Sequence, residues 1–200
     1  MNSAAAPQNL IIELRSILDP LDVSQFFPKA QPLEVELGCG DASFLVNHAK
    51  AHPDHNFIGV ERLGGRIRKL DRKGRRAGLT NLRGVRIESS YFLQYLLPPK
   101  SVAALHIYFP DPWPKRKHLK NRFINEHFIE IAQRVLTRDG IVYLRTDHED
   151  YFEQMTTVFA ASIAFRPTET PPELSALLTD FEADFQKQGV QTRRAAYQLI

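Results

Sequence analysis

Short apolar runs alternate with amphipathic segments along most of this 200-residue chain. The apolar runs are typical of buried strands, and the segments between them repeat apolar residues every three or four positions, as helices do. This alternation predicts an α/β fold in which a mostly parallel sheet carries helices on both faces. Strands are expected at 33–37, 57–61, 82–87, 103–109, 141–144 and 190–199, and helices at 43–50, 63–77, 124–135, 149–160 and 179–187.

Turn residues and prolines mark the borders of these elements. We expect Asp139-Gly140 to separate a helix from the strand after it, and residues 167–172 to form a loop. Residues 33–200 are expected to form one domain, which at this length can bury a sizeable core. In the extension 1–32, residues 1–8 are expected to be disordered, 9–18 to form a short helix and 20–32 to be a linker.

Composition excludes several classes of protein. No apolar run approaches the roughly 18 residues of a membrane span, and the N-terminal region lacks the basic and apolar parts of a signal peptide. The one cysteine, Cys39, cannot form an intramolecular disulfide, and no Cys or His stands near it at metal-site spacing. We therefore expect a cytoplasmic protein with no metal and no membrane contact, and either a monomer or a homodimer.

A glycine-containing turn, Gly38-Cys39-Gly40, follows the first predicted strand. Its two glycines would let the backbone approach a ligand closely. Glu61 ends the second predicted strand, about 20 residues further on, where an acid commonly binds ribose hydroxyls. These features suit a nicotinamide nucleotide or S-adenosylmethionine. Ser43 stands where a dinucleotide fingerprint needs its third glycine, which favours S-adenosylmethionine.

Two further acids lie within or at the end of predicted strands. Glu36 lies within an apolar strand, where an unpaired carboxylate is costly, so we expect a polar or cationic partner for it. The candidates are the ammonium group of a methionine-type cofactor and an internal Arg or Lys. Glu88 ends the third predicted strand, where it would either accept a hydrogen bond from an adenine amino group or be an exposed acid.

The stretch from Tyr108 to Lys115 follows a buried strand and contains three prolines in five residues. Proline disrupts both helices and strand ladders, so this stretch is expected to be a stiff turn. It carries Asp111, Trp113 and Lys115 at the carboxyl end of a strand, where open α/β sheets bind their ligands. A plain proline-rich connector is the alternative interpretation.

Basic residues are concentrated in two windows. Residues 62–86 contain ten Lys or Arg and one acid, and residues 115–122 contain five more and no acid. Fifteen of the 26 basic residues therefore lie in these windows, although the net charge is only +3. Clustered cations near a site suggest a polyanionic partner, and a solvated helix face is the alternative.

Together these motifs resemble those of the bacterial tRNA (guanine-N7-)-methyltransferases over roughly residues 33–200. The proline-rich block with its basic residues is highly specific, whereas the glycine turn is shared by many methyltransferases. The residues that carry the resemblance are Glu36-Leu37-Gly38-Cys39-Gly40, Ile58-Gly59-Val60-Glu61, Phe109-Pro110-Asp111-Pro112-Trp113-Pro114-Lys115, Lys120, Arg122, Thr146-Asp147 and Thr179-Asp180-Phe181-Glu182.

The resemblance implies a class I methyltransferase fold with a Rossmann-like, mostly parallel seven-stranded sheet. It implies S-adenosyl-L-methionine as methyl donor and N7 of guanine 46, in the tRNA variable loop, as acceptor. Asp111 would be the catalytic residue. The cofactor would lie at Glu36, Gly38, Gly40, Glu61, Glu88 and Asp111, and the tRNA guanosine at Lys115, Asp147, Thr179, Asp180, Phe181 and Glu182.

Three positions depart from the family's pattern. Ala42 replaces a glycine that often follows the glycine turn, and its small methyl group should leave the turn intact. Glu88 stands where the family usually has aspartate, which bears on the adenine contact. Asn121 replaces an arginine common in the basic run, which removes at most one phosphate contact.

The residues agree with the implied chemistry. Guanine N7 has a free lone pair and no proton, so its attack on a sulfonium methyl needs no strong general base. No Ser-His-Asp or Cys-His set is evident, in agreement with this. The enzyme must align the reacting atoms and balance charge that moves from sulfur to the purine, which a fixed carboxylate such as Asp111 can do.

Asp147 could accept hydrogen bonds from guanine N1 and its exocyclic amine, with Glu182 as a competing candidate. Thr179 and Glu182 also match a capping box and could serve only as a helix cap. Trp113 would either stack on the base or pack the loop. The residues expected to bind phosphates, which predicts salt-sensitive binding, are Lys115, Arg116, Lys117, Lys120 and Arg122.

Three other functions stay open from the residues alone. The chain could be a methyltransferase that acts on another RNA or on protein. It could be a nicotinamide-dependent oxidoreductase, against which Ser43 argues. It could also be an RNA-binding module without catalysis. The acids predicted to bind a cofactor near the glycine turn argue against this.

Overall fold

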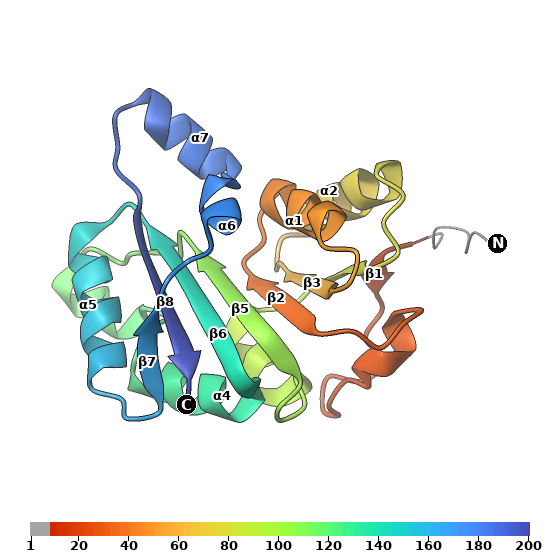
Figure 1. Cartoon of the computed structure of the whole chain (residues 1–200), viewed down its shortest axis with the longest axis horizontal. Helices are drawn as coiled ribbons and strands as arrows, with labels where there is room; N and C mark the ends of the chain where they lie inside the picture. The colour runs from red at the N-terminus through yellow and green to blue at the C-terminus, as the bar shows by residue number, and fades with distance from the viewer. Residues whose placement is uncertain (1–8) are drawn as a thin grey trace.

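The computed structural model describes residues 9–200, and the eight strands in this range form one sheet (Figure 1). Its strand order is β1-β4-β3-β2-β5-β6-β8-β7. Neighbouring strands are parallel, except that β8 is antiparallel to β6 and β7. The strands are β1 (Ile11–Ile12), β2 (Leu33–Leu37), β3 (Asn56–Val60), β4 (Leu82–Val85), β5 (Val102–Tyr108), β6 (Leu136–Thr146), β7 (Phe165–Thr168) and β8 (Arg193–Leu199).

Helices cover both faces of this sheet (Figure 1). One face packs against α1 and α2 through Phe44 and Leu70, and the other packs against α4 and α5 through Phe128 and Tyr151. The predicted α/β fold is therefore confirmed. The α-helices are α1 (Ser43–Ala51), α2 (Gly64–Arg76), α3 (Ser89–Tyr91), α4 (Glu126–Val135), α5 (Glu149–Ala160), α6 (Pro172–Ala176) and α7 (Asp180–Lys187). The 3-10 helices η1 (Val23–Phe26) and η3 (Arg116–Asn121) and the π-helical turn η2 (Phe92–Leu96) complete the set.

Strand β2 is buried at all five positions although it alternates apolar and acidic residues. Leu33, Val35 and Leu37 belong to the core on the α4 side of the sheet. Successive side chains of a strand point to opposite faces, so Glu34 and Glu36 point to the face that α1 and α2 cover. The helices α1 and α2 therefore pack over two buried acids.

The N-terminal extension differs from its prediction. Residues 9–18 contain no helix, and Ile11 and Ile12 form β1 along the edge of β4. Leu10 is fully buried, and its amide donates to Asp71 Oδ1 on α2 at 2.8 Å, which fixes this segment in an extended form. Strand β1 also brings the strand count to eight, where the resemblance implied seven. Residues 1–8, expected to be disordered, lie outside the described residues.

Two other borders were predicted wrongly. Asp139-Gly140 lies inside β6, which begins directly after α4. Asp139 has a φ of 61°, and the β5–β6 register shifts between Val102 and Ala104, so this dipeptide forms a bulge instead of ending a helix. Residues 167–172 are not all loop, because Pro167 belongs to β7, an edge strand, where proline is tolerated.

Helices α6 and α7 connect the antiparallel strands β7 and β8, and Figure 1 shows them at one end of the sheet near α1. The capping box at the start of α7 is confirmed. Thr179 Oγ1 accepts a hydrogen bond from the Glu182 amide at 3.1 Å, and Glu182 Oε2 accepts one from the Thr179 amide at 3.1 Å. Within residues 9–200, every helix is too short or too polar to span a lipid bilayer.

Candidate active site

Strands β2, β3, β4 and β5 end at the same edge of the sheet, and a cleft of about 520 Å³ opens there. Four residues singled out from the sequence line it together: Gly38, Glu61, Glu88 and Asp111. Several other lining residues were not predicted to belong to the site, although all of them follow a strand end or the proline-rich turn. These are Arg62, Leu63, Arg66, Ser89, Ser90, Asn121 and Phe123.

The glycine turn after β2 is held by Glu61. Gly38 and Gly40 have φ values of 76° and 56°, which glycine adopts without strain. Glu61 is buried, and its two carboxylate oxygens accept the amides of Gly40 at 3.2 Å and Leu63 at 2.8 Å. Ala42, where the family often has glycine, has a φ of 63°, at a cost of about 1–2 kcal/mol. The turn forms despite this cost.

Glu36 is buried, and its Oε2 has no hydrogen-bond partner among residues 9–200. Burial raises the pKa of Glu36 well above its usual value, and the nearby Arg145 only partly offsets this. Leu37 and Gly38, the next residues along the chain, line the cleft. A buried carboxyl oxygen without a donor beside a cleft can be satisfied by a cationic group of a ligand.

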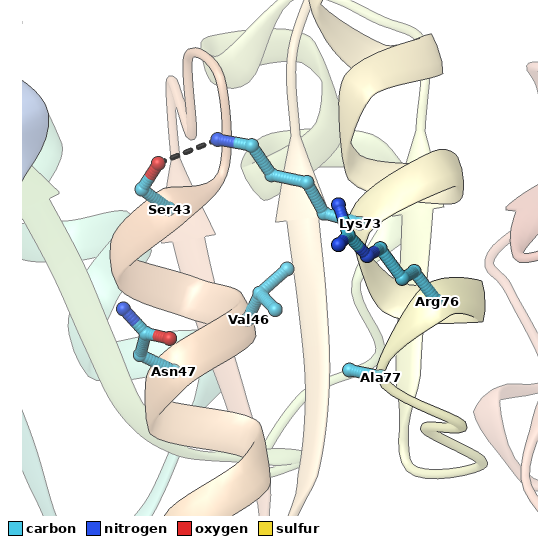
Figure 2. A pocket seen from close by; sticks show the side chains of 6 residues that line it. All are labelled: Ser43, Val46, Asn47, Lys73, Arg76 and Ala77. Atoms are coloured by element: carbon cyan, nitrogen blue, oxygen red, sulfur yellow. Dashed lines mark hydrogen bonds between the residues drawn. The ribbon is translucent and has the colours of Figure 1, made fainter.

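Lys73 of α2 contacts the segment between the glycine turn and α1. Its Nζ lies 2.6 Å from Asp41 Oδ2 and 2.5 Å from Ser43 Oγ (Figure 2). Ser43 Oγ also donates to Asp180 Oδ2 at 3.1 Å, which connects α7 to the start of α1. Burial would raise the pKa of Asp41, but hydrogen bonds from Asp180 and Lys73 hold the pKa well below its usual range. The same contact with Asp41 raises the pKa of Asp180.

Glu88 is exposed at the rim of the cleft. Its Oε1 accepts the amide of Ser90 at 2.9 Å and its Oε2 accepts the amide of Tyr91 at 2.8 Å, so the carboxylate caps α3. This cap explains an acid at this position without a ligand. A contact with adenine stays a prediction.

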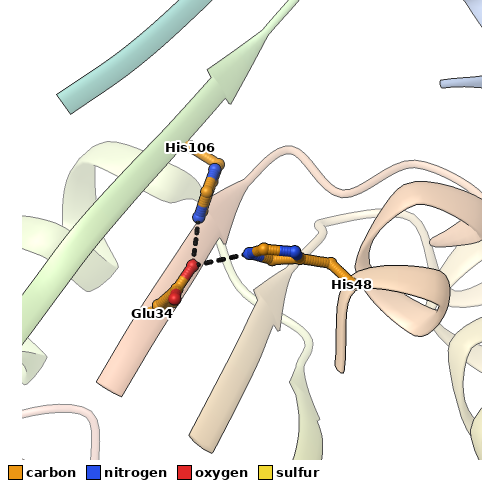
Figure 3. Close-up of side chains that lie close together, drawn as sticks. All are labelled: Glu34, His48 and His106. Atoms are coloured by element: carbon orange, nitrogen blue, oxygen red, sulfur yellow. Dashed lines mark hydrogen bonds and ion pairs between the residues drawn. The ribbon is translucent and has the colours of Figure 1, made fainter. Parts of the chain in front are cut away.

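A buried ionisable cluster, missed in the sequence analysis, surrounds Glu34 on the α1 face of the sheet. Glu34 Oε2 accepts hydrogen bonds from His48 Nε2 at 2.9 Å and from His106 Nε2 at 2.6 Å (Figure 3). His55 Nδ1 lies 2.6 Å from Glu34 Oε1. Because His106 Nε2 donates to a carboxylate, Nδ1 of the neutral ring can accept from the Tyr108 hydroxyl, 2.8 Å away.

The charge states within this cluster follow from its burial. Burial would raise the pKa of Glu34, but hydrogen bonds from His106 and His48 hold the pKa well below its usual range. Burial lowers the pKa of His106 and favours its neutral form. Among residues 9–200, these three side chains also bring potential metal ligands within 4.8 Å of one another. Their mutual hydrogen bonds satisfy the facing atoms without an ion, and the absence of a metal stays a prediction.

The proline-rich stretch after β5 forms the stiff turn that was predicted. Phe109 and Trp113 have φ values of 53° and 43°, which large side chains rarely adopt. The Phe109 amide donates to the Arg145 carbonyl oxygen at 2.8 Å. Asp111 is exposed, lines the cleft, and has no hydrogen bond or ion pair with any residue in the described range. A constrained backbone thus presents a carboxylate that is free to contact a ligand.

Arg122 was expected to bind phosphate, and the structure corrects this. Its side chain is buried, with the guanidinium 4.8 Å above the Tyr151 ring. Nε donates to the Pro112 carbonyl oxygen at 2.8 Å, Nη1 donates to Gln154 Oε1 at 2.8 Å, and Nη2 pairs with Asp150. Arg122 therefore fastens the proline-rich turn to α5 and cannot reach a solvent-exposed phosphate.

Trp113 lines the cleft with 37% of its surface exposed. Its ring centroid lies 5.7 Å from that of His118, and the two rings are nearly perpendicular. The indole is thus accessible for stacking and also packs within its own loop. The other residues expected to bind phosphates all remain exposed: Lys115, Arg116, Lys117 and Lys120.

Glu182 of α7 is fully buried between two arginines. Its Oε2 lies 2.6 Å from Arg145 Nη1, and its Oε1 lies 2.7 Å from Arg194 Nη2. A direct contact between Glu182 and a base would require these pairs to open. The exposed Phe181 lies with its ring centroid 6.2 Å from that of Phe109, so α7 also contacts the proline-rich turn.

Lys115 and Asp147 follow β5 and β6 at the same edge of the sheet, outside the cleft lining. Lys115 is exposed and Asp147 is half-buried. Neither side chain forms a hydrogen bond or ion pair with another residue in the part of the chain that the structure describes. Both are therefore free to meet a substrate, and their roles stay predictions.

Residues 30–195 match a family model described as "Putative methyltransferase". A protein from Sodalis glossinidius named tRNA (guanine-N(7)-)-methyltransferase is 34% identical over 175 residues, which cover 85% of this chain and 73% of that protein. A protein of the same name from Chromohalobacter salexigens is 36% identical over 178 residues, which cover 87% of this chain and 72% of that protein.

Among solved structures, the 16S rRNA methyltransferase KamB is similar to this chain with a TM-score of 0.65. The alignment covers 90% of this chain and 94% of KamB at 14% sequence identity. At this identity the similarity concerns the fold alone, which is the α/β fold of class I methyltransferases.

Proposed function

Because this chain belongs to the tRNA (guanine-N7-)-methyltransferase family, we propose that it methylates N7 of guanine 46 in the variable loop of tRNA. One observation supports this most strongly: Gly38 of the glycine turn, Glu61 and Asp111 line a single cleft. The proposed donor is S-adenosyl-L-methionine, and the proposed catalytic residue is Asp111.

Three features of the cleft fit this donor. The orphan Oε2 of Glu36 suits an ammonium group. Glu61 directly follows β3, and its carboxylate oxygens still have lone pairs available for ribose hydroxyls. No atom lies within 4 Å of the position where a Gly38 side chain would begin, so the turn leaves room for a ligand. Bound here, S-adenosylmethionine would supply an electrophilic methyl group on a sulfonium.

The protein's own task in this reaction is alignment and charge stabilisation. Guanine N7 carries a lone pair and no proton, so no side chain has to remove one before the attack. Asp111 is unpaired and is held by a constrained turn, which Arg122 and Arg145 fasten. A fixed carboxylate needs little reorganisation as positive charge develops on the purine, which lowers the barrier.

We propose that Asp147 recognises guanine through its N1–H and exocyclic amine, since its carboxylate is free at the same edge of the sheet. Lys115 would contact the nucleotide beside it. Within the α7 stretch, the exposed Asp180 and Phe181 are the candidates for direct contact. Thr179 and Glu182 would act by holding α7 in place through the capping box and the two arginine pairs.

A tRNA substrate implies that the protein works in the cytoplasm, and the reaction needs no metal. Either a monomer or a homodimer could carry it out, since the glycine turn, Glu61 and Asp111 come from one chain.

The test is methyl transfer from labelled S-adenosylmethionine to unmodified tRNA transcripts, followed by nucleoside analysis. One transcript carries adenine in place of guanine 46, and one protein sample carries Asp111→Ala. We expect 7-methylguanosine when the wild-type protein acts on the unchanged transcript, and none with the adenine-46 transcript or with Asp111→Ala. The matched control is Asp54→Ala, which removes an exposed acid in the turn before β3, at the edge of the sheet opposite the cleft.

Methylation of the adenine-46 transcript at another guanine would refute the position. Transfer to ribosomal RNA but not to tRNA would refute the substrate and leave the methyltransferase assignment in place. Full activity of Asp111→Ala would remove the proposed catalytic role.

A further inference from the structure

Helix α2 has one apolar face and one strongly basic face. Ile67, Leu70 and Gly74 are buried against the sheet. Three cations follow one another on the opposite side at helical spacings of three and four residues, and all are exposed: Lys69, Arg72 and Arg76.

No acid within residues 9–200 forms an ion pair with any of these three side chains. The ion pairs of α2 involve other residues: Lys73 with Asp41, Arg75 with Asp71, and Arg66 with Glu61 at 3.9 Å. Like charges three and four residues apart on a helix repel one another. The basic stripe is therefore unfavourable for α2 by itself, and an anionic partner would relieve the repulsion.

The stripe extends directly from the active-site cleft. Arg62, two residues before α2, and Arg66, in its first turn, line the cleft that also contains Asp111. At the other end of the helix, Arg76 and Lys73 line a groove of about 390 Å³ between α1 and α2 (Figure 2). A helix of 13 residues is about 20 Å long, so the basic surface continues about that far from the cleft.

A second exposed basic segment, residues 115–120, lies on the other side of the cleft. It follows β5, whereas α2 follows β3, and β2 lies between these strands in the sheet. A guanine held in the cleft would therefore have basic surface on both sides along which its flanking backbone could continue.

We propose that the exposed stripe Lys69–Arg72–Arg76 of α2 is a docking surface for the phosphate backbone of the tRNA substrate. This inference rests on the proposed function and adds a surface to the same site. Each side chain would contact one phosphate and release its counterions, so each contact adds to the salt dependence of binding.

The test compares two triple variants that lower the net charge equally. The first is Lys69→Gln, Arg72→Gln, Arg76→Gln. The matched control is Lys29→Gln, Lys50→Gln, Arg138→Gln, which removes three exposed cations near the amino ends of the strands, opposite the cleft. The measurements are tRNA affinity from 50 to 300 mM salt, steady-state methylation, and S-adenosylmethionine affinity with thermal melting as checks of folding.

We expect the α2 variant to bind tRNA about 10–100-fold more weakly at low salt, with a salt slope shallower by about 0.7–0.9 for each lost contact. Its KM for tRNA should rise, while kcat and cofactor affinity stay at the wild-type values. If the α2 variant has the same salt slope of tRNA binding and the same KM as the control variant, the inference is overturned. The proposed function would still be supported in that case, provided that the wild type methylates tRNA. A wild-type protein that methylates no tRNA would instead refute the proposed function.

Discussion

The guanidinium of Arg122 donates a hydrogen bond from Nε to the carbonyl oxygen of Pro112 at 2.8 Å. Pro112 directly follows Asp111, so this bond links the proposed catalytic carboxylate to a buried arginine that also binds Gln154 on α5. A loop with three prolines is stiff, but its position relative to the cleft depends on such a contact. Arg122 is therefore a positioning residue.

We expect Arg122→Leu to lower kcat at least tenfold and to leave the affinity for S-adenosylmethionine nearly unchanged, because the turn would lose its anchor while the glycine turn stays intact. Stability should fall by about 1–3 kcal/mol as buried polar partners lose their donor. Arg122→Lys should restore only part of kcat because lysine lacks the planar set of donors. Arg138→Leu, at an exposed arginine, is the control. Wild-type kcat in Arg122→Leu would contradict the anchoring role.

Glu182 and Asp147 should behave differently when each loses its charge. Glu182→Gln leaves buried Arg145 without its anion, so we expect the free energy of unfolding to fall by about 3–5 kcal/mol. Asp147→Asn removes a charge with no internal partner and should leave stability within about 0.5 kcal/mol while tRNA methylation falls. Urea unfolding and methylation assays on both variants check this. A stable but inactive Glu182→Gln would instead favour direct base recognition by Glu182.

Stability should fall as the pH drops from 7 to 5, because burial lowers the pKa of His106 below its usual value of 6.5. Below pH 6.5 this histidine binds a proton in the unfolded chain but not in the folded chain. The free energy of unfolding therefore falls by up to about 1.4 kcal/mol for each pH unit. The depressed pKa of Glu34 adds a further loss only below about pH 4.5, its unfolded value.

Thermal melting across this pH range measures the effect. His106→Gln should flatten the dependence between pH 7 and 5, whereas His127→Gln, at an exposed histidine, should not. If the pH dependence of the melting temperature is unchanged in His106→Gln, a group other than His106 controls that dependence.

Cofactor affinity should also depend on pH. Burial raises the pKa of Glu36, so the free protein holds this carboxyl in its neutral form at acidic pH. If an ammonium group binds Glu36, binding must expel that proton, and affinity should rise with pH by up to tenfold per unit below the raised pKa. Calorimetry in buffers of different ionisation enthalpy between pH 5 and 7 counts the proton. Glu36→Gln should bind more weakly and release none, and proton release by this variant would assign the proton elsewhere.

Much of the architecture was predictable from the sequence because its signals are local. The apolar alternation located β2 to β6 and β8, and spacing within each segment located α1, α2, α4, α5 and α7. Residues that follow parallel strands gather at one edge, so Gly38, Glu61, Glu88 and Asp111 could be placed in one cleft before the structure was known. The errors fell where a distant contact decided the conformation. Residues 9–18 became extended because β4 and Asp71 bind them.

The tertiary structure decided what each charged side chain does. In the sequence, Arg122 looks like the exposed lysines beside it, and Glu182 looks like a surface acid at a helix start. Arg122 is buried because α5, 28 residues further along the chain, supplies its anionic partner. Glu182 is buried because Arg145, 37 residues earlier in the chain, supplies its cationic partner. Glu34 and His106 meet across 72 residues. Strand and turn propensities act between near neighbours, so the sequence by itself determined most of the elements and the position of the site. A buried charge is stabilised only by partners that folding brings together, so the roles of these acids and arginines emerged only from the fold.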